Sequence, residues 1–137
     1  MPGRNTFGFA AVILWCLLGF APLAPVAAQA GTSAVIHVVP GAPGALITGA
    51  VLRGERDVYR LAAKAGLRLH VEIVSVEQNA VFQLYLPGKG NKTLPGAGEA
   101  DDATLWNGTL PKSGVYRIVV GGTRGNAEYT VRVDLAE

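Results

Sequence analysis

Hydrophobic and polar side chains alternate along most of the chain after residue 30, and the clearest case is Leu67–Val76. Within it, Leu69, Val71 and Ile73 stand at every second position, with charged or polar residues between them. A period of two places one set of side chains on a buried face and the other set in solvent. No segment shows apolar residues at helical spacing over a useful length. The pattern therefore predicts strands with one buried face and one solvent-exposed face.

Glycine, proline and asparagine divide residues 31–137 into short runs of this kind. Short strands at intervals of about 8–12 residues are typical of a β-sandwich or barrel. We expect an all-β fold, a single antiparallel, jelly-roll-like sandwich of about eight strands. The predicted strands are Ala34–Val39, Leu46–Leu52, Asp57–Ala62, Leu67–Val76, Ala80–Leu86, Ala103–Leu110, Val115–Val120 and Ala127–Leu135.

The alternation also predicts the core and the connections. Gly121–Asn126 is expected to be a hairpin loop, and Lys89–Asp102 a long polar loop. For Trp106 a buried or half-buried position is favoured over a sugar-stacking surface, because large aromatic residues dominate small cores. The expected core comprises Leu69, Val71, Ile73, Phe82, Leu84, Tyr116, Ile118, Tyr129, Val131 and Val133.

The N-terminal segment has a different pattern. A short basic start containing Arg4 precedes the apolar run Phe7–Phe20, and a stretch rich in alanine and proline follows. This order is that of a secretory signal, and the run is shorter than the roughly 20 residues of a membrane span. We expect residues 1–30 to be a signal peptide, cleaved after Ala28 or Ala30, and residues 31–137 to be the sandwich domain. A retained N-terminal anchor is the alternative.

Cleavage would change the composition of the protein. The only cysteine, Cys16, would leave with the signal, so the exported domain would depend on its hydrophobic core and not on disulfides. The net charge of +2 would fall to +1 with the loss of Arg4. Since basic and acidic residues are interspersed, the sequence has no footprint for nucleic acid and no polybasic surface for a membrane. We expect a periplasmic or secreted protein.

Catalytic and metal-binding motifs are hard to find. The sequence has no Gly-x-Ser-x-Gly elbow and no phosphate-binding glycine loop. His37 and His70 lie within predicted strands without convergent ligands, and Glu99, Asp101 and Asp102 do not have the spacing of an EF-hand loop. We therefore expect no enzyme activity, no cofactor and no metal site. A small hydrolase with a site assembled from several loops is the competing interpretation.

Several segments, taken in order, carry a resemblance to a known family. They are Gly54-Glu55 before Asp57-Val58-Tyr59, Phe82-Gln83-Leu84-Tyr85, Trp106 to Pro111, Ser113 to Ile118, and Tyr129-Thr130-Val131. From about Gly49 to its end the chain resembles the bacterial pre-peptidase C-terminal type of β-sandwich. Within that group it is similar to the stand-alone periplasmic inhibitors of invertebrate-type and goose-type lysozymes. Unlike an appended pre-peptidase domain, this one is expected to have no protease beside it.

The resemblance implies a role for one turn. The inhibitor families carry a Ser-Gly-x-Tyr motif on a loop that enters the lysozyme cleft, and Ser113, Gly114 and Tyr116 match it. Pro111 and Gly114 also fit a purely structural turn, with Tyr116 packed inward in phase with Ile118. In the functional interpretation, Lys112 and Ser113 protrude and bind the carboxyl groups of the cleft.

The partner-binding residues predicted on this basis are Lys112, Ser113, Gly114 and Tyr116, and the expected partner is a protein, a lysozyme. The lysozyme type is left open. The alternative function is that of a generic sandwich module. Such a module would bind another envelope protein or a glycan, through the Lys89–Asp102 loop or around Trp106.

Overall fold

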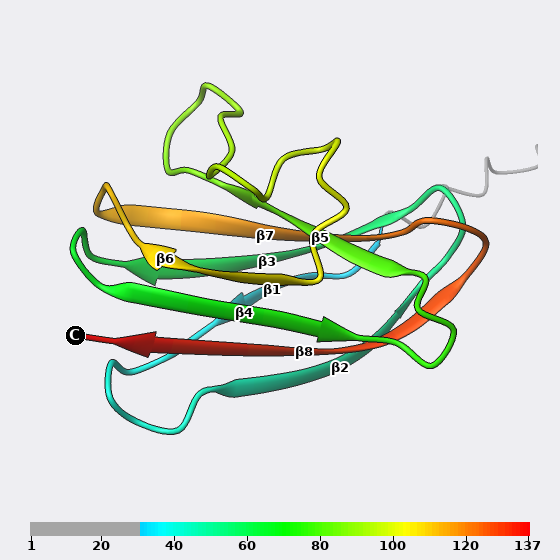
Figure 1. The fold of residues 1–137 in the computed structure, drawn as a ribbon, viewed down its shortest axis with the longest axis horizontal. Helices are drawn as coiled ribbons and strands as arrows, with labels where there is room; N and C mark the ends of the chain where they lie inside the picture. The colour runs from blue at the N-terminus through cyan, green and yellow to red at the C-terminus, as the bar shows by residue number, and fades with distance from the viewer. Residues whose placement is uncertain (1–30) are drawn as a thin grey trace, which may run out of the picture.

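The structure, a computed structural model, describes residues 31–137 and contains eight strands and no helix in that range (Figure 1). The strands form two four-stranded sheets, so the predicted all-β sandwich is confirmed. The predicted signal peptide lies outside the described residues. The strands are β1 (Ser33–Ile36), β2 (Ala45–Val51), β3 (Arg56–Ala63), β4 (Arg68–Val74), β5 (Ala80–Tyr85), β6 (Leu105–Thr109), β7 (Gly114–Gly122) and β8 (Ala127–Ala136).

Successive strands alternate between the two sheets. One sheet has the order β1-β3-β7-β5 and the other β2-β8-β4-β6. Every connection between described strands therefore crosses from one sheet to the other. The prediction of a hairpin at Gly121–Asn126 was wrong, because β7 and β8 belong to different sheets and the turn between them bridges the two layers. A local turn signal cannot tell a hairpin from such a crossing.

The strand pairs are antiparallel except one. β1 runs parallel to β3, with Ser33 opposite Val58 and Ile36 opposite Leu61. β1 also ends at Ile36, three residues before the expected end. The backbone N–H of Val58 donates to the carbonyl of Thr32 at 2.8 Å, which extends this pairing to the start of the described chain. The predicted antiparallel arrangement thus holds for the other five pairs of strands.

The core lies between the sheets and matches the alternation of the sequence. All ten predicted core residues are buried, and Phe82, Leu84, Tyr116 and Ile118 are completely inaccessible to solvent. β8 shows the pattern most clearly, since Tyr129, Val131, Val133 and Leu135 point inward and the residues between them are more exposed. Burial of these side chains is the main stabilising contribution in a domain of this size.

The loop after β5 is less polar than predicted. Leu94 and Ala97 within it are buried, at 2% and 0% exposure. The N–H of Leu94 donates to the carbonyl of Leu84 at 2.9 Å, and the N–H of Leu84 donates to the carbonyl of Ala97 at 3.0 Å. The loop therefore covers the free edge of β5, which would otherwise expose unpaired backbone groups. It rises beside β5 and β7 before it enters β6 (Figure 1).

A buried polar cluster joins the two sheets. The Tyr129 hydroxyl of β8 donates to Asp57 Oδ2 of β3 at 2.5 Å, and the Tyr59 hydroxyl lies 2.5 Å from that of Tyr129. The backbone N–H of Thr32 donates to Asp57 Oδ1 at 2.7 Å. Burial and the hydrogen bond to Asp57 raise the pKa of Tyr129, and burial raises that of Tyr59. Both tyrosines are therefore neutral, and the cluster is a structural tie between the layers.

Candidate functional site

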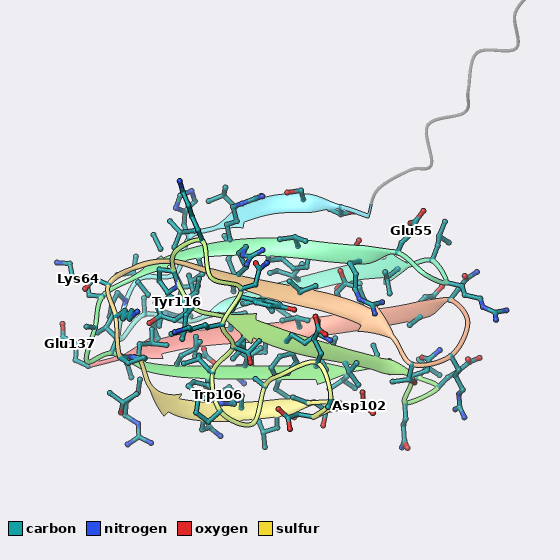
Figure 2. All side chains as sticks on the ribbon, turned by 90° about the horizontal axis from the view of Figure 1, so that it is seen from above. Glu55, Lys64, Asp102, Trp106, Tyr116 and Glu137 are labelled. Atoms are coloured by element: carbon teal, nitrogen blue, oxygen red, sulfur yellow. The ribbon has the colours of Figure 1, made fainter. Side chains whose placement is uncertain are left out.

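The turn between β6 and β7 lies at one end of the sandwich. Figure 2 shows Tyr116 at the same end as Lys64 and Glu137, far from Glu55. Lys112 and Ser113 at the tip are exposed, whereas Tyr116 behind them is completely buried. Three hollows of the surface, with volumes of about 450, 470 and 560 Å³, are lined by residues outside this turn. The turn thus presents exposed side chains at its tip and lines none of these three hollows.

The Tyr116 side chain supports the turn from inside. Its hydroxyl donates to the carbonyl of Lys112 at 2.7 Å and accepts from the backbone N–H of Lys112 at 3.2 Å. Burial raises the pKa of Tyr116, and the hydrogen bond with the Lys112 backbone opposes that shift. The hydroxyl stays protonated and so can hold both backbone groups of Lys112. The expected inward packing of Tyr116 is present.

Gly114 allows the chain to turn into β7. Its φ is +145°, a value that side chains with a Cβ rarely adopt. A Cβ atom at this position would also lie 2.7 Å from Pro87 Cβ, too close for any contact. The turn is therefore packed against the end of β5. Glycine is required here for two independent reasons, and neither involves a partner.

Ser113 has a hydrogen bond that fixes its side chain and leaves its proton free. Ser113 Oγ accepts from the backbone N–H of Ala65 at 2.9 Å. A serine hydroxyl has one proton to donate and two lone pairs. The bond with Ala65 uses a lone pair, so the O–H can donate to an external acceptor. The connection from β3 to β4, Lys64–Leu67, is thereby tied to the turn.

Two lysines lie at this end of the molecule. Lys112 is exposed at the tip, and Lys64 is exposed on the neighbouring connection. Within residues 31–137 neither lysine forms an ion pair. Their positive charge favours a partner with acidic groups. No sequence motif pointed to Lys64, because its neighbour Ala65 is 48 residues from Ser113 and only the fold brings the two segments together.

Trp106, the alternative candidate for sugar stacking, packs within the domain. It is half-buried and packs on the core. Its Nε1–H donates to the carbonyl of Pro95 at 2.8 Å, and a Cβ at Gly108 would lie 2.6 Å from its ring. The indole thus packs against Gly108 and beneath the loop after β5. This agrees with the half-buried position that the sequence favoured.

The other polar candidates also have partners within the domain. Asp101 Oδ2 accepts from the N–H of Gly98 at 2.6 Å, and Glu99 Oε1 accepts from the Tyr85 hydroxyl at 3.1 Å. His70 Nδ1 lies 2.5 Å from Asn107 Oδ1 on the outer face of the second sheet. Residues 31–137 contain no group of three or more His, Cys, Asp or Glu side chains placed to hold a metal ion. In the same range no helix is long and apolar enough to cross a membrane.

Solved structures with this fold include several lysozyme inhibitors. The Aeromonas hydrophila PliG, a periplasmic inhibitor of g-type lysozyme, matches with a TM-score of 0.61 and 28% identity, over 77% of this chain and 99% of that one. The chain has the fold of the PliG inhibitors. Salmonella Typhimurium PliG matches with a TM-score of 0.58 and 26% identity, over 77% of this chain and 98% of PliG.

The wider relationship is one of fold alone. The pre-peptidase C-terminal domain of a Bacillus anthracis collagenase matches with a TM-score of 0.57 and 15% identity, over 77% of this chain and 98% of that domain. No family model and no curated protein matches the sequence. The resemblance inferred from the motifs, to periplasmic lysozyme inhibitors and to pre-peptidase sandwiches, is confirmed by the inhibitors of g-type lysozyme and by the collagenase domain. The binding role of the residues that match the lysozyme-inhibitor motif remains a prediction.

Proposed function

We propose that this chain is an exported inhibitor of g-type lysozyme that acts through the Lys112–Tyr116 turn. The observation that carries the proposal is the likeness to two PliG structures at 28% and 26% identity, each covered almost completely. Those proteins are periplasmic, which agrees with the secretory signal expected in residues 1–30. We also propose that the domain has no catalytic activity of its own.

The chemistry of the turn supports this role. Glycoside hydrolases act with a pair of carboxyl groups in the cleft. The free O–H of Ser113 can donate to one carboxylate, and the Lys112 ammonium can approach the other. Hydrogen bonds that involve an ionised group contribute about 1.5–3 kcal/mol each. Two such contacts would place the turn where the substrate has to bind.

The rigidity of the turn also favours tight binding. Tyr116 holds the backbone of Lys112, Ala65 holds Ser113, and Gly114 is packed against Pro87. Ordering a side chain at an interface costs about 0.5–1.5 kcal/mol when it is mobile in the free protein. Because Ser113 is already held, binding would cost less for this side chain. Lys64 on the adjoining connection would add a second positive charge at the rim.

The experiment is an inhibition assay with purified processed protein against goose-, chicken- and invertebrate-type lysozymes. We expect inhibition of the goose-type enzyme at micromolar concentration or below, and weaker or no inhibition of the others. The double variant Lys112→Ala, Ser113→Ala should weaken inhibition at least about tenfold, a loss of about 1.4 kcal/mol or more.

A matched control lies at the opposite end of the sandwich. The turn between β7 and β8 also presents a hydroxyl and a cation, Thr123 and Arg124, both exposed. The double variant Thr123→Ala, Arg124→Ala removes a hydroxyl and a positive charge from the end of the sandwich opposite the proposed site. It should leave inhibition unchanged. Equal losses in both double variants would contradict the assignment of the turn. Absence of inhibition of any lysozyme would contradict the function itself.

A further inference from the structure

The outer face of the β1-β3-β7-β5 sheet has a groove that the proposed inhibitor function does not use. Its volume is about 560 Å³. The strand register places Val58, Val119 and Gln83 in one row across β3, β7 and β5, and these residues form its floor. The wall comes from the loop after β5, which crosses the ribbons of β7 and β5 when seen from above (Figure 2). The lining residues are Arg56, Val58, Gln83, Tyr85, Asn91, Glu99, Arg117 and Val119.

Gln83 is the most informative residue in this groove. The residue is only 9% exposed, although it lies on the outer face of the sheet. Within residues 31–137 its amide forms no hydrogen bond, and the part that remains accessible lines the groove. The described residues contain no buried side-chain nitrogen or oxygen that lacks a hydrogen-bond partner, so the polar atoms of this amide reach the surface of the groove. An amide that can both donate and accept is therefore available here to a bound molecule.

Two arginines stand at opposite ends of the groove, and both are held in place. The Arg117 guanidinium lies 4.7 Å from the centre of the Tyr85 ring and donates to Asn91 Oδ1 at 2.8 Å. Arg56 lies flat on β7, because a Cβ at Gly121 would be 2.5 Å from its Nη1. Neither arginine forms an ion pair within residues 31–137. Each guanidinium keeps N–H donors that can form bidentate hydrogen bonds with a carboxylate.

The other polar groups of the groove, Glu99 and Gln83, can form hydrogen bonds with the hydroxyls of a ligand. Glu99 Oε1 accepts from the Tyr85 hydroxyl, so its other oxygen can accept from a ligand. Gln83 can serve as donor or acceptor, and the floor is apolar. Arg56 lies opposite Gly121, four residues from Arg117 along β7. At about 3.3 Å per residue, the backbone positions of the two arginines are roughly 13 Å apart along the strands. The groove thus combines separated cations with neutral and acidic groups.

We propose that this groove binds a glycan that bears carboxylates, of the uronic-acid class. The arginines bind carboxylates on different sugar units, and Gln83 and Glu99 bind the hydroxyls between them. An acidic peptide would satisfy the arginines but would offer few hydroxyls to Gln83 and Glu99. The inference is independent of lysozyme inhibition, because none of these residues belongs to the Lys112–Tyr116 turn.

The test is titration calorimetry of the processed protein with a hexameric oligogalacturonate, a neutral cellohexaose and a hexaglutamate peptide. We expect the oligogalacturonate to bind, and the other two to bind at least about tenfold more weakly. Equal binding of hexaglutamate would overturn the glycan assignment, since charge alone would then explain it. Lack of oligogalacturonate binding at millimolar concentration would overturn the site.

The variants locate the ligand. Arg56→Ala and Arg117→Ala should each weaken binding at least about tenfold. Arg132→Ala, on the outer face of the other sheet, should have no effect. Gln83→Leu should weaken binding and change the melting temperature little, because no hydrogen bond of its side chain is present within residues 31–137 to be lost, and its polar atoms reach the groove. Binding that survives the loss of both Arg56 and Arg117, in a folded protein, would contradict the proposal.

Discussion

Two tyrosines of this domain use their hydroxyls in opposite ways. Tyr129 closes a network with Asp57 and Tyr59 in which donors and acceptors meet one another inside the core. Tyr116 holds the backbone of Lys112, and the side chains at the tip keep an O–H and an ammonium directed outward. Both hydroxyls are neutral, since burial raises both pKa values. A network that satisfies itself stabilises the fold, whereas we propose that the unused hydrogen-bonding capacity at the tip of the turn serves binding.

Removing the acceptor of the closed network should have the largest effect on stability. Asp57→Ala removes the acceptor of the part-buried Thr32 N–H and leaves the Tyr129 hydroxyl with Tyr59 as its remaining partner. Each of the two donors loses its bond to Asp57 at a cost of about 1–3 kcal/mol, so we expect a total loss of about 2–6 kcal/mol in the free energy of unfolding. Urea denaturation measures it. Asp134→Ala removes an acid from a surface pair with Arg132 and should cost less than about 1 kcal/mol. Similar losses in the two variants would contradict the account.

Exchanging one hydroxyl in each network separates fold from function. We expect Tyr129→Phe and Tyr116→Phe each to cost about 1–3 kcal/mol of stability. Only Tyr116→Phe should weaken lysozyme inhibition, because only it releases the Lys112 backbone. Inhibition is compared at a temperature at which both variants are folded. If Tyr129→Phe weakened inhibition as much as Tyr116→Phe, the distinction between the networks would fail.

The raised tyrosine pKa values predict a loss of stability in alkali. A phenol whose folded pKa is above its unfolded value near 10 contributes stability below that pH and loses it as the pH rises. The slope is up to about 1.4 kcal/mol per pH unit for each such group. Urea midpoints measured between about pH 8 and pH 11 should fall above pH 10, and the double variant Tyr59→Phe, Tyr129→Phe should show a shallower fall. Titration of every tyrosine near pH 10 in the folded protein would contradict the assignment.

The smallest expected effect on stability is at the tip of the turn. Ser113→Ala removes one exposed hydrogen bond, from the Ala65 N–H, and should cost less than about 1 kcal/mol. Inhibition should nevertheless fall about tenfold or more, because the contact with a carboxylate is lost. Ser113→Thr keeps the hydroxyl and should retain part of the inhibition. A large loss of stability with unchanged inhibition would show that Ser113 serves the fold alone.

The sequence was sufficient for the strands and the core because alternation reports burial directly. Leu69, Val71 and Ile73 are buried as their spacing required. It was insufficient for the parallel pairing of β1 with β3 and for the crossing between β7 and β8, since local pattern does not record which strands become neighbours. The turn residues were found through a motif. Lys64 and the Arg56–Arg117 groove were not, because distant segments meet there only after folding.

The most direct test of the central claim is whether the turn occupies the lysozyme cleft. Titration calorimetry would measure the affinity of the processed protein for goose-type lysozyme, alone and with a chitooligosaccharide that fills the cleft. We predict that the oligosaccharide weakens binding in proportion to its own occupancy, and that the Lys112→Ala, Ser113→Ala variant binds weakly in both conditions. Affinity that is the same with the cleft filled, or no binding at all, would contradict the account.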